Sequence, residues 1–519
     1  MEHMTSLGPH LTRTWDELSD RAEILIVGGG LAGLELAKHL ELAGAGNVLV
    51  VEAGAGDDLR HVYAANDAPS ADRIWTDEQS DEYFVQPWNS ATEPHFGQGS
   101  GLRRRVGGRS LYWHGVLLPV EDWALTEADW PRTVIDDLVR SWRGGASLYA
   151  RVRSDLAEWS RRVATTTASA SEDDALRVGH FRFAGPPRAV RPAGAGSARW
   201  EAYSPLSHWL ESDPAARKSG GKGGVRIAAD LETVAVLTGG GRAEGVVVRH
   251  RGSGEEKRIT AGKVVLAAGT VESTRLAIQA LHQDGEPAGD RLTGLVDHIV
   301  QGFNVSFEAE DLPERLVSRA REGVFAFTPG GGASHSNLFI QLDLTDAGEL
   351  RLEVWATGEQ IRSAQGVVAC SPREEWPWPV TVSTGLDTQD SLTVEAQRDE
   401  LREFWAAWCT EFDLKWVPLD FDFSFTAPSR TLRSVRESLR AEDRPSLHHQ
   451  PVTWSSPLGT EEHEGGTLAI GDVLDENQEF IEIGGLFAVG PAIFPRQGSA
   501  NPSLTSLALS RRLAPILLA

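Results

Sequence analysis

Cysteine is almost absent from this chain of 519 residues, which has only Cys370 and Cys409. Two thiols cannot build a disulfide framework, and they exclude a cysteine-rich metal site. The histidines, aspartates and glutamates show no metal-ligand spacing either. The sequence therefore predicts no metal site.

Long apolar runs are also missing. No stretch reaches the roughly 18 consecutive apolar residues that suggest a membrane-spanning helix. Residues 1–21 are polar and lack the apolar segment of a signal peptide. We therefore expect a soluble, cytoplasmic protein without a membrane partner.

Positive charge is scarce as well. The chain has 50 Lys and Arg against 74 Asp and Glu, a formal net charge of −24. A nucleic-acid surface needs clustered cations, and the one basic run, residues 103–105, is short. No nucleic-acid partner is expected. The length and a hydrophobic content of 41% predict an ordinary globular protein of two domains.

The clearest pattern present is a βαβ unit near the start of the chain. An apolar run at 22–27 predicts a buried strand, 34–42 a helix and 48–51 a second strand. Between the first two lies Gly28-Gly29-Gly30-Leu31-Ala32-Gly33, and Glu52 follows the last glycine by 19 residues at a strand end. This context is typical of dinucleotide binding rather than of a glycine-rich structural turn, which is the alternative.

Each glycine of this fingerprint has a physical role. Gly28 permits the turn, Gly30 lets a pyrophosphate reach bare backbone, and Gly33 lets the helix pack closely on the strand. The helix N-terminus offers unpaired N–H groups to the phosphates. Glu52 would accept hydrogen bonds from ribose hydroxyls and repel a 2′-phosphate, which favours FAD or NAD over NADP.

Strand patterns return in the second half of the chain. A helix is predicted at 393–412, with an apolar stripe that includes Trp405 and Trp408. The alternation of the strands after residue 303 predicts an antiparallel sheet with one face in water. The predicted strands lie at 225–227, 234–237, 245–248, 263–269, 323–327, 337–342, 350–356 and 380–382.

Four ordered motifs carry a resemblance to a known family. They are Val106 to Trp113, Leu266 to Thr274, His463 to Leu468 and Gly498 to Thr505. Together with the fingerprint they resemble the glucose–methanol–choline (GMC) oxidoreductases, FAD enzymes that oxidise alcohols. Asp297-His298 is similar to an Asp-His dipeptide of many members. The resemblance runs from about 22 to 515 and is weakest in the middle third.

Within the family, Gly107 to Trp113 resembles the pyranose oxidase and sugar oxidase branch. Pyranose 2-oxidase carries a covalent flavin on a histidine just before this tryptophan. Here Tyr112 stands at that position and His114 lies on the other side of Trp113, so we expect non-covalent FAD. Pro491 replaces an aspartate of many relatives, as in pyranose oxidase-like sequences.

The resemblance implies a catalytic pair, His463 and Asn501. Neutral imidazole is available near neutral pH and would take the hydroxyl proton, while Asn501 would orient the substrate oxygen. Pro502 begins a helix whose positive end would face the flavin. The fingerprint and the resemblance together assign the cofactor contacts to Gly28, Gly30, Leu31, Ala32, Gly33, Glu52, Gly107, Gly108, Ser110, Trp113, Val234, Gly269, Gly490, Asn501 and Pro502.

Other candidate residues have simpler interpretations. Glu461 and Glu462 are read as a solvated acidic run rather than a carboxylate pair, because chain neighbours point apart. His448 and His449 are read as loop histidines. Trp376 and Trp378 lie between prolines, and a sugar-stacking face there is a minor alternative to a core role.

The predicted fold is α/β, with a Rossmann-like FAD-binding domain and a substrate domain built on an antiparallel sheet. The FAD domain would comprise 22–145, 225–300 and 445–519, the substrate domain 303–444, and 146–224 a helical and loop insertion. The predicted reaction is oxidation of a CH–OH group of a sugar, glycoside, cyclitol or glycosylated natural product. Oxygen or another acceptor would reoxidise the flavin. A lyase of the same fold and a non-catalytic FAD-binding protein remain as alternatives.

Overall fold

The structure is a computed structural model. Two features of the sequence lie outside the residues it describes, namely His448 and the Ser/Thr/Ala-rich stretch that begins at Thr165. It describes residues 7–519 except 8–9, 13–14, 98, 162–175, 195–196, 198, 212–223, 284, 286–288, 330–333, 346–347 and 441–448.

The first layer is a mostly parallel sheet built on the predicted βαβ unit. Strand β2 (Arg21–Val27) leads through the glycine loop into helix α1 (Leu31–Leu42), and β3 (Val48–Val51) returns beside β2. The helix begins three residues before its predicted start. Gly28 has φ +109°, and a Cβ there would lie 2.3 Å from the carbonyl oxygen of Ala267. Only glycine fits this turn.

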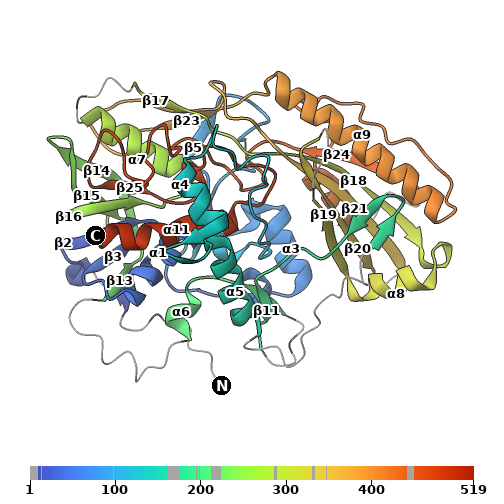
Figure 1. The fold of residues 1–519 in the computed structure, drawn as a ribbon, viewed down its shortest axis with the longest axis horizontal. Helices are drawn as coiled ribbons and strands as arrows, with labels where there is room; N and C mark the ends of the chain where they lie inside the picture. Colours follow the sequence, from blue (N-terminus) through green and yellow to red (C-terminus); the bar gives the residue numbers. More distant parts are fainter. Residues whose placement is uncertain are drawn as a thin grey trace.

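Six further strands complete this sheet, which lies on the left of Figure 1. Their pairing is parallel from β1 to β16 and between β16 and β25, and antiparallel from β16 through β15 to β14. These strands are β1 (Leu11–Thr12), β13 (Val225–Ala228), β14 (Leu231–Gly239), β15 (Arg242–His250), β16 (Glu256–Leu266) and, at the branch, β25 (Leu486–Ala488).

The second layer is an antiparallel sheet of five strands, on the right of Figure 1. The sequence did not predict β18, whose residues are buried on both faces and show no alternation. Its central position follows from pairing with β21 on one side and β24 on the other. In spatial order the strands are β19 (Val324–Thr328), β20 (Ser336–Leu344), β21 (Glu349–Glu359), β18 (His298–Glu308) and β24 (Val452–Ser456).

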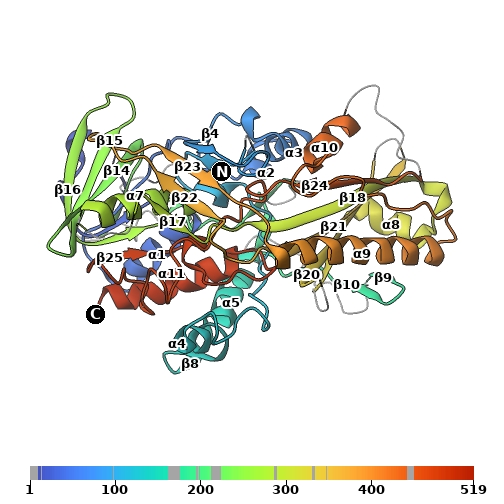
Figure 2. The same cartoon turned by 90° about the horizontal axis from the view of Figure 1, so that it is seen from above.

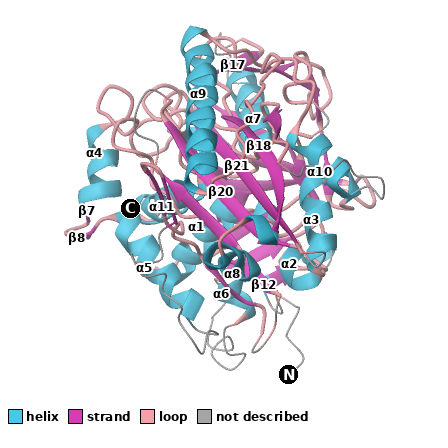
Figure 3. Ribbon diagram, turned by 90° about the vertical axis from the view of Figure 1, so that its right-hand side faces the viewer, coloured by secondary structure: helices cyan, strands magenta, loops and turns pink. Residues whose placement is uncertain are grey.

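One face of this antiparallel sheet is covered by the long helix α9 (Thr388–Glu411), which lies in front of the strands in Figure 3. Asp387 and Asp390 form a capping box at its start. Trp405 and Trp408 are buried against β18 and its neighbours. The predicted apolar stripe thus packs on the sheet. No helix within the described residues is both long and apolar enough to cross a bilayer.

The other face of the antiparallel sheet carries both polar and aromatic residues and is half-buried along β21. Along β21, Leu352 and Val354 point under α9, whereas Glu353 and Trp355 point the opposite way. Phe339 on this second face packs with residues of the first layer, among them Ala500. The face predicted to be in water is therefore the one turned toward the first layer.

Two smaller units connect the layers. Helix α7 (Thr270–Gln283) packs on β14 and on a four-stranded sheet of β17 (Arg291–Thr293), β22 (Val367–Cys370), β23 (Val380–Ser383) and β5 (Trp88–Ser90). The C-terminal helix α11 (Ser503–Leu517) packs on α1 and α5 (Leu148–Arg161). Figure 2 shows α11 beside α1.

The remaining described elements are short and lie around these units. The helices are α2 (Val62–Ala65), α3 (Ala68–Thr76), α4 (Arg132–Ile135), α6 (Ser207–Leu210), α8 (Glu314–Glu322) and α10 (Leu432–Arg440). The strands are β4 (Phe84–Val85), β6 (Leu102–Arg103), β7 (Ser141–Trp142), β8 (Gly145–Ala146), β9 (Leu176–Val178), β10 (Phe181–Phe183), β11 (Val190–Pro192) and β12 (Trp200–Ala202).

The sheet pairing bears on the expected domain ranges. Strand β24 falls within 445–519, expected in the first domain, yet it pairs with β18 in the second sheet. The hairpin of β9 and β10 falls within the expected insertion and packs beside α9 and β19. Parts of both ranges therefore contribute to the antiparallel layer.

Candidate active site

A cavity lies at the carboxyl edge of the first sheet. The last residues of β2 and β3, Val27 and Val51, line it, as do Ala267 and Val489, which directly follow β16 and β25. In α/β sheets the loops at this edge are the usual place for a ligand. The cavity is thus positioned by the parallel layer, and the chemistry around it comes from loops.

Three helices begin at this cavity. Leu31 opens α1, Thr270 opens α7 and Ser503 opens α11, and all three residues line the wall. The residues before α1 and α11, Gly30 and Pro502, supply no side-chain hydrogen bond to the first turn. Free N–H groups and the positive ends of the helix dipoles therefore face the cavity and favour a ligand with negative charge.

The glycine loop leaves room for such a ligand. A Cβ on Gly30 would meet no atom within 4 Å, so bare backbone borders open space. A Cβ on Gly33 would lie 2.1 Å from the carbonyl oxygen of Gly28, which explains the close packing of α1 on its strand. Gly108, from a distant loop, faces Gly30 across the cavity wall. This cradle fits a pyrophosphate.

Glu52 is held firmly at the end of β3. One carboxylate oxygen accepts a hydrogen bond from the N–H of Gly29 and the other from the N–H of Gly54, each at 2.7 Å. Burial raises its pKa despite these two bonds. Each oxygen keeps a second lone pair, so the carboxylate remains able to accept a ligand hydroxyl.

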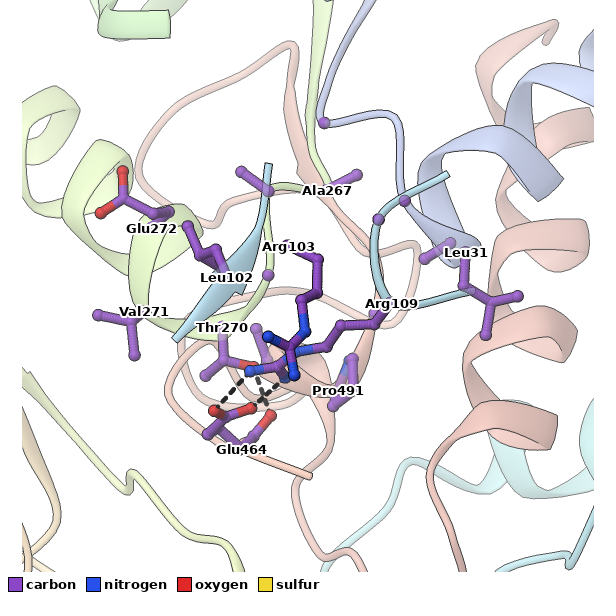
Figure 4. A pocket seen from close by; sticks show the side chains of 18 of the residues that line it. Leu31, Leu102, Arg103, Arg109, Ala267, Thr270, Val271, Glu272, Glu464 and Pro491 are labelled. Carbon is purple, nitrogen blue, oxygen red and sulfur yellow. Dashed lines mark hydrogen bonds and ion pairs between the residues drawn. The ribbon is translucent and has the colours of Figure 1, made fainter. Parts of the chain in front are cut away.

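An ion pair joins two loops of the cavity wall. The guanidinium of Arg109 donates to both carboxylate oxygens of Glu464 and to the carbonyl oxygens of Gly101 and Glu462. Figure 4 shows Arg109 reaching Glu464 beside Thr270. Burial would lower the pKa of Arg109, but the carboxylates of Glu464 and Glu462 outweigh it and raise that pKa. The loop that carries His463 is therefore clamped to the loop after β6.

His463 and Asn501 come together as the sequence predicted. The Nε2 atom of His463 lies 3.3 Å from the amide nitrogen of Asn501. The Oδ1 atom of Asn501 is buried and has no hydrogen-bond partner among the described residues. His463 itself lines the cavity. An acceptor without a donor, next to an imidazole, fits a ligand that brings a hydroxyl group.

A second histidine, His298, lies behind this pair. Its Nδ1 atom is 2.8 Å from Nδ1 of His463, and its Nε2 atom is 3.1 Å from the carbonyl oxygen of Gly498. Burial lowers the pKa of His298 to about 4. Burial, helped by His298 and Arg109, also holds the pKa of His463 well below its usual value. Both imidazoles are therefore neutral at neutral pH.

No protein-family model and no curated protein matches the chain. Solved structures, in contrast, match it over nearly its whole length. Pyridoxine 4-oxidase from Mesorbium loti is 16% identical, with a TM-score of 0.55 over 95% of this chain and 99% of its own. An arginine-to-lysine variant of Aspergillus oryzae formate oxidase, described for its effect on FAD modification, is 13% identical, with a TM-score of 0.56 over 96% and 98%. An arginine-to-alanine variant is 15% identical, with the same score and coverage.

The chain has the GMC oxidoreductase fold. The expected α/β architecture with an antiparallel second sheet is thereby confirmed. Of the assigned cofactor residues, those that line the cavity are Gly28, Gly30, Leu31, Ala32, Glu52, Gly108, Ser110, Trp113, Gly269, Gly490 and Pro502.

Four assigned residues do not line the cavity of this GMC fold. Gly33 lies beneath the cradle, and Gly107 packs against Leu111. Val234 lies in a hydrophobic cluster, and its carbonyl oxygen accepts from Arg275 and Gln279, although its neighbour Thr233 does reach the cavity. Asn501 stands behind His463.

Glu461 and Glu462 do not form a solvated run, so that expectation was wrong. Both line the cavity. Glu462 lies 3.5 Å from the guanidinium of Arg103 and 3.6 Å from that of Arg109. The clamp by Arg109 draws this acidic stretch inward, which its local sequence does not reveal.

Of the tryptophans between prolines, Trp378 is a core residue and Trp376 is partly buried. Trp378 is 5% exposed and packs edge-on against His282 of α7. Trp376 packs against the same hydrophobic cluster. His449 lies on the second layer, where its Nε2 atom is 3.0 Å from a carboxylate oxygen of Asp311. None of the three lines the cavity.

Sequence reasoning missed Arg109, Glu464 and the placement of His298. Arg109 stands at the variable position of Gly-Gly-x-Ser, and Glu464 follows His463 directly. The only indication in the sequence was that one motif of the resemblance contains a cation, Arg109, and another contains an acid, Glu464. Nothing local in the sequence showed which acid would meet which cation.

Proposed function

We propose that the protein is an FAD-dependent oxidoreductase that converts a CH–OH group to a carbonyl. One observation carries the proposal: a single cavity is lined by the glycine cradle, Glu52 and His463, and Asn501 contacts that histidine from behind. The cradle and the helix N-termini suit the pyrophosphate of FAD, and Glu52 suits a ribose hydroxyl. A bound FAD supplies the hydride acceptor for the carbon that is oxidised.

The chain's own residues supply the proton chemistry. In this proposal the Nε2 atom of neutral His463 takes the hydroxyl proton, while the hydrogen on the carbon leaves as hydride. The unpaired Oδ1 atom of Asn501 lies beside this position and limits how the substrate oxygen sits. The N-terminus of α11 offers positive partial charge nearby. Asn501 binds no proton at any accessible pH, so His463 alone serves as base.

We further propose that the FAD is held without a covalent bond. Tyr112 is buried and its hydroxyl group accepts a hydrogen bond from Arg105, and His114 packs among Tyr63, Trp75 and Trp200. Neither residue lines the cavity. Acid precipitation of yellow protein is expected to release the flavin into the supernatant. Colour that stays in the pellet would contradict non-covalent binding.

For the substrate we propose a sugar, glycoside or cyclitol, and Glu461 favours one that carries an amino group. The Glu461 carboxylate lines the cavity two residues before the base. Burial raises its pKa, partly offset by a hydrogen bond from Ser456. Arg436 is nearby, but both of its contacts are to Glu353. A substrate ammonium would give Glu461 an ion pair that no described cation provides.

An anaerobic screen tests the activity and the substrate class together. Neutral and amino-bearing sugars and cyclitols are mixed with the oxidised protein, and the flavin absorbance is followed. Bleaching with an alcohol supports the oxidoreductase and counts against both the lyase and the non-catalytic alternative. Glu461→Gln is expected to weaken the amino-bearing substrates and leave neutral ones unchanged. An equal effect on both sets would contradict the role of Glu461.

A further inference from the structure

His298 is fully buried, and both of its ring nitrogens are in contact with polar atoms. Its Nε2 atom faces the carbonyl oxygen of Gly498 at 3.1 Å, and its Nδ1 atom faces Nδ1 of His463 at 2.8 Å. The two rings are nearly perpendicular, at 78°. The orientation of one imidazole is thus tied to that of the other.

The position of each hydrogen in these contacts follows from which atoms can donate a hydrogen bond and which can only accept one. A carbonyl oxygen only accepts, so Nε2 of His298 must carry the hydrogen. Neutral imidazole has one N–H, which leaves Nδ1 of His298 as an acceptor. The hydrogen of the 2.8 Å contact therefore belongs to Nδ1 of His463. It follows that Nε2 of His463 carries the free lone pair.

We infer that His298 is a positioning residue that holds His463 in the tautomer with its free lone pair on Nε2. The inference rests on the proposed function, in which that nitrogen takes the hydroxyl proton. It goes further by stating which residue selects the base form. When Nε2 of His463 gains the proton, its Nδ1–H stays in place and its hydrogen bond to His298 becomes charge-assisted.

The contacts around the two rings make this arrangement rigid. Asp297 accepts hydrogen bonds from the N–H of His298 at 2.8 Å and from the N–H of Gly459 at 2.5 Å. The N–H of Gly498 donates to Glu359, and the amide of Gln497 donates to the carbonyl oxygen of His463 at 2.7 Å. Both the carbonyl that selects the tautomer and the base itself are therefore anchored.

Asn501 is consistent with the same tautomer. Its amide nitrogen, a donor only, lies 3.3 Å from Nε2 of His463. A hydrogen on that Nε2 atom would put two donors against each other. With the amide in this orientation, the lone pair stays on Nε2, in agreement with the contact to the carbonyl of Gly498.

Two isosteric substitutions separate the contacts of His298. In His298→Asn the side-chain oxygen replaces Nδ1 and still accepts from His463, but the bond to Gly498 is lost. In His298→Gln the amide reaches the position of Nε2 and still donates to Gly498, but the acceptor for His463 is lost. A purely structural role predicts similar losses in the two variants, whereas a positioning role predicts that only His298→Gln is impaired.

The test combines stopped-flow flavin reduction with nitrogen NMR of histidine-labelled holoprotein, where His463 is assigned by its absence in His463→Ala. We expect wild type and His298→Asn to show a protonated Nδ1 and a bare Nε2 on His463. We expect His298→Gln to lose this signature and reduce flavin more slowly, up to the about 10²–10⁴-fold that a general base contributes. FAD content and KM should stay unchanged.

Two results would overturn the inference. One is a wild-type spectrum with the hydrogen on Nε2 of His463, which decides the matter even if a variant fails to fold. The other is a His298→Gln protein with native reduction rate and native spectrum. Failure of the proposed function looks different: His463→Ala would then reduce flavin at the native rate, whatever the tautomer.

Discussion

The two sheets of the protein place their polar groups in opposite ways. In the parallel layer, β3 is buried on both faces and polar chemistry appears only past the strand ends, as at Glu52. In the antiparallel layer, polar residues such as Asn304 and Glu353 lie within the strands, on the same face as Trp355. A parallel sheet covered on both sides has no wet face, so its functional groups gather in loops. The antiparallel sheet turns the face that carries Asn304 and Glu353 toward the cavity side.

This difference predicts that function and stability can be broken separately. Substitutions in the loops at the edge of the parallel layer should affect the cofactor or the chemistry. Substitutions under α9 should affect stability. Four changes test this separation, taken from the largest expected effect to the smallest.

The largest effect is expected for His463→Ala. It should retain FAD yet lower the rate of flavin reduction by substrate by about 10²–10⁴-fold, because the general base is gone. Stopped-flow absorbance measures the rate. Asn501→Ala is the matched variant: it should also be slower but keep the wild-type pH dependence, since the titrating His463 remains. Near-native flavin reduction by His463→Ala would contradict the proposed role of His463 as the general base.

Trp405→Ala should act on stability alone. Trp405 is 1% exposed, packs edge-on against Phe303 and donates to the carbonyl oxygen of Val417. Its loss should lower the free energy of unfolding by about 3–5 kcal/mol, seen as a fall in Tm. The control is Trp416→Ala, because Trp416 is 56% exposed and should shift stability by less than about 0.5 kcal/mol. A folded Trp405→Ala protein that has lost FAD would break the separation.

Glu52→Ala should weaken FAD retention by roughly 1.5–3 kcal/mol, because hydrogen bonds to a charged group are lost. The buried N–H groups of Gly29 and Gly54 also lose their acceptor. Glu52→Gln keeps one oxygen as an acceptor, so its FAD retention should lie between those of the wild type and Glu52→Ala. Fluorescence of released flavin during dialysis measures retention. Equal retention in all three proteins would show that Glu52 does not contact the cofactor.

The smallest effect concerns pH. Only neutral His463 accepts a proton, and burial depresses its pKa. The rate of flavin reduction should therefore rise with pH through a value well below 6.5 and stay constant above it. The neighbouring ring of His298 and the guanidinium of Arg109 depress this pKa further. A rate that still rises strongly above pH 7 would place the titrating group elsewhere.

Much of the parallel layer was predictable from local pattern. The strand before Gly28, the helix after it and the acid at position 52 are close in sequence, so their geometry follows from backbone rules. The pairing of His463 with Asn501 was also predicted, because the resemblance supplied a spacing. In both cases the spacing of residues in short motifs was enough to predict how they lie relative to one another.

The sequence predicted the βαβ unit, the glycine cradle and the pairing of His463 with Asn501. Tertiary structure alone decided that Arg109 meets Glu464, 355 residues away, and that His298 meets His463, 165 residues away. It also decided that β24 pairs with β18 and that Glu461 turns inward. Local patterns specify backbone conformation over a few residues, whereas these contacts depend on strand register and loop packing between distant segments.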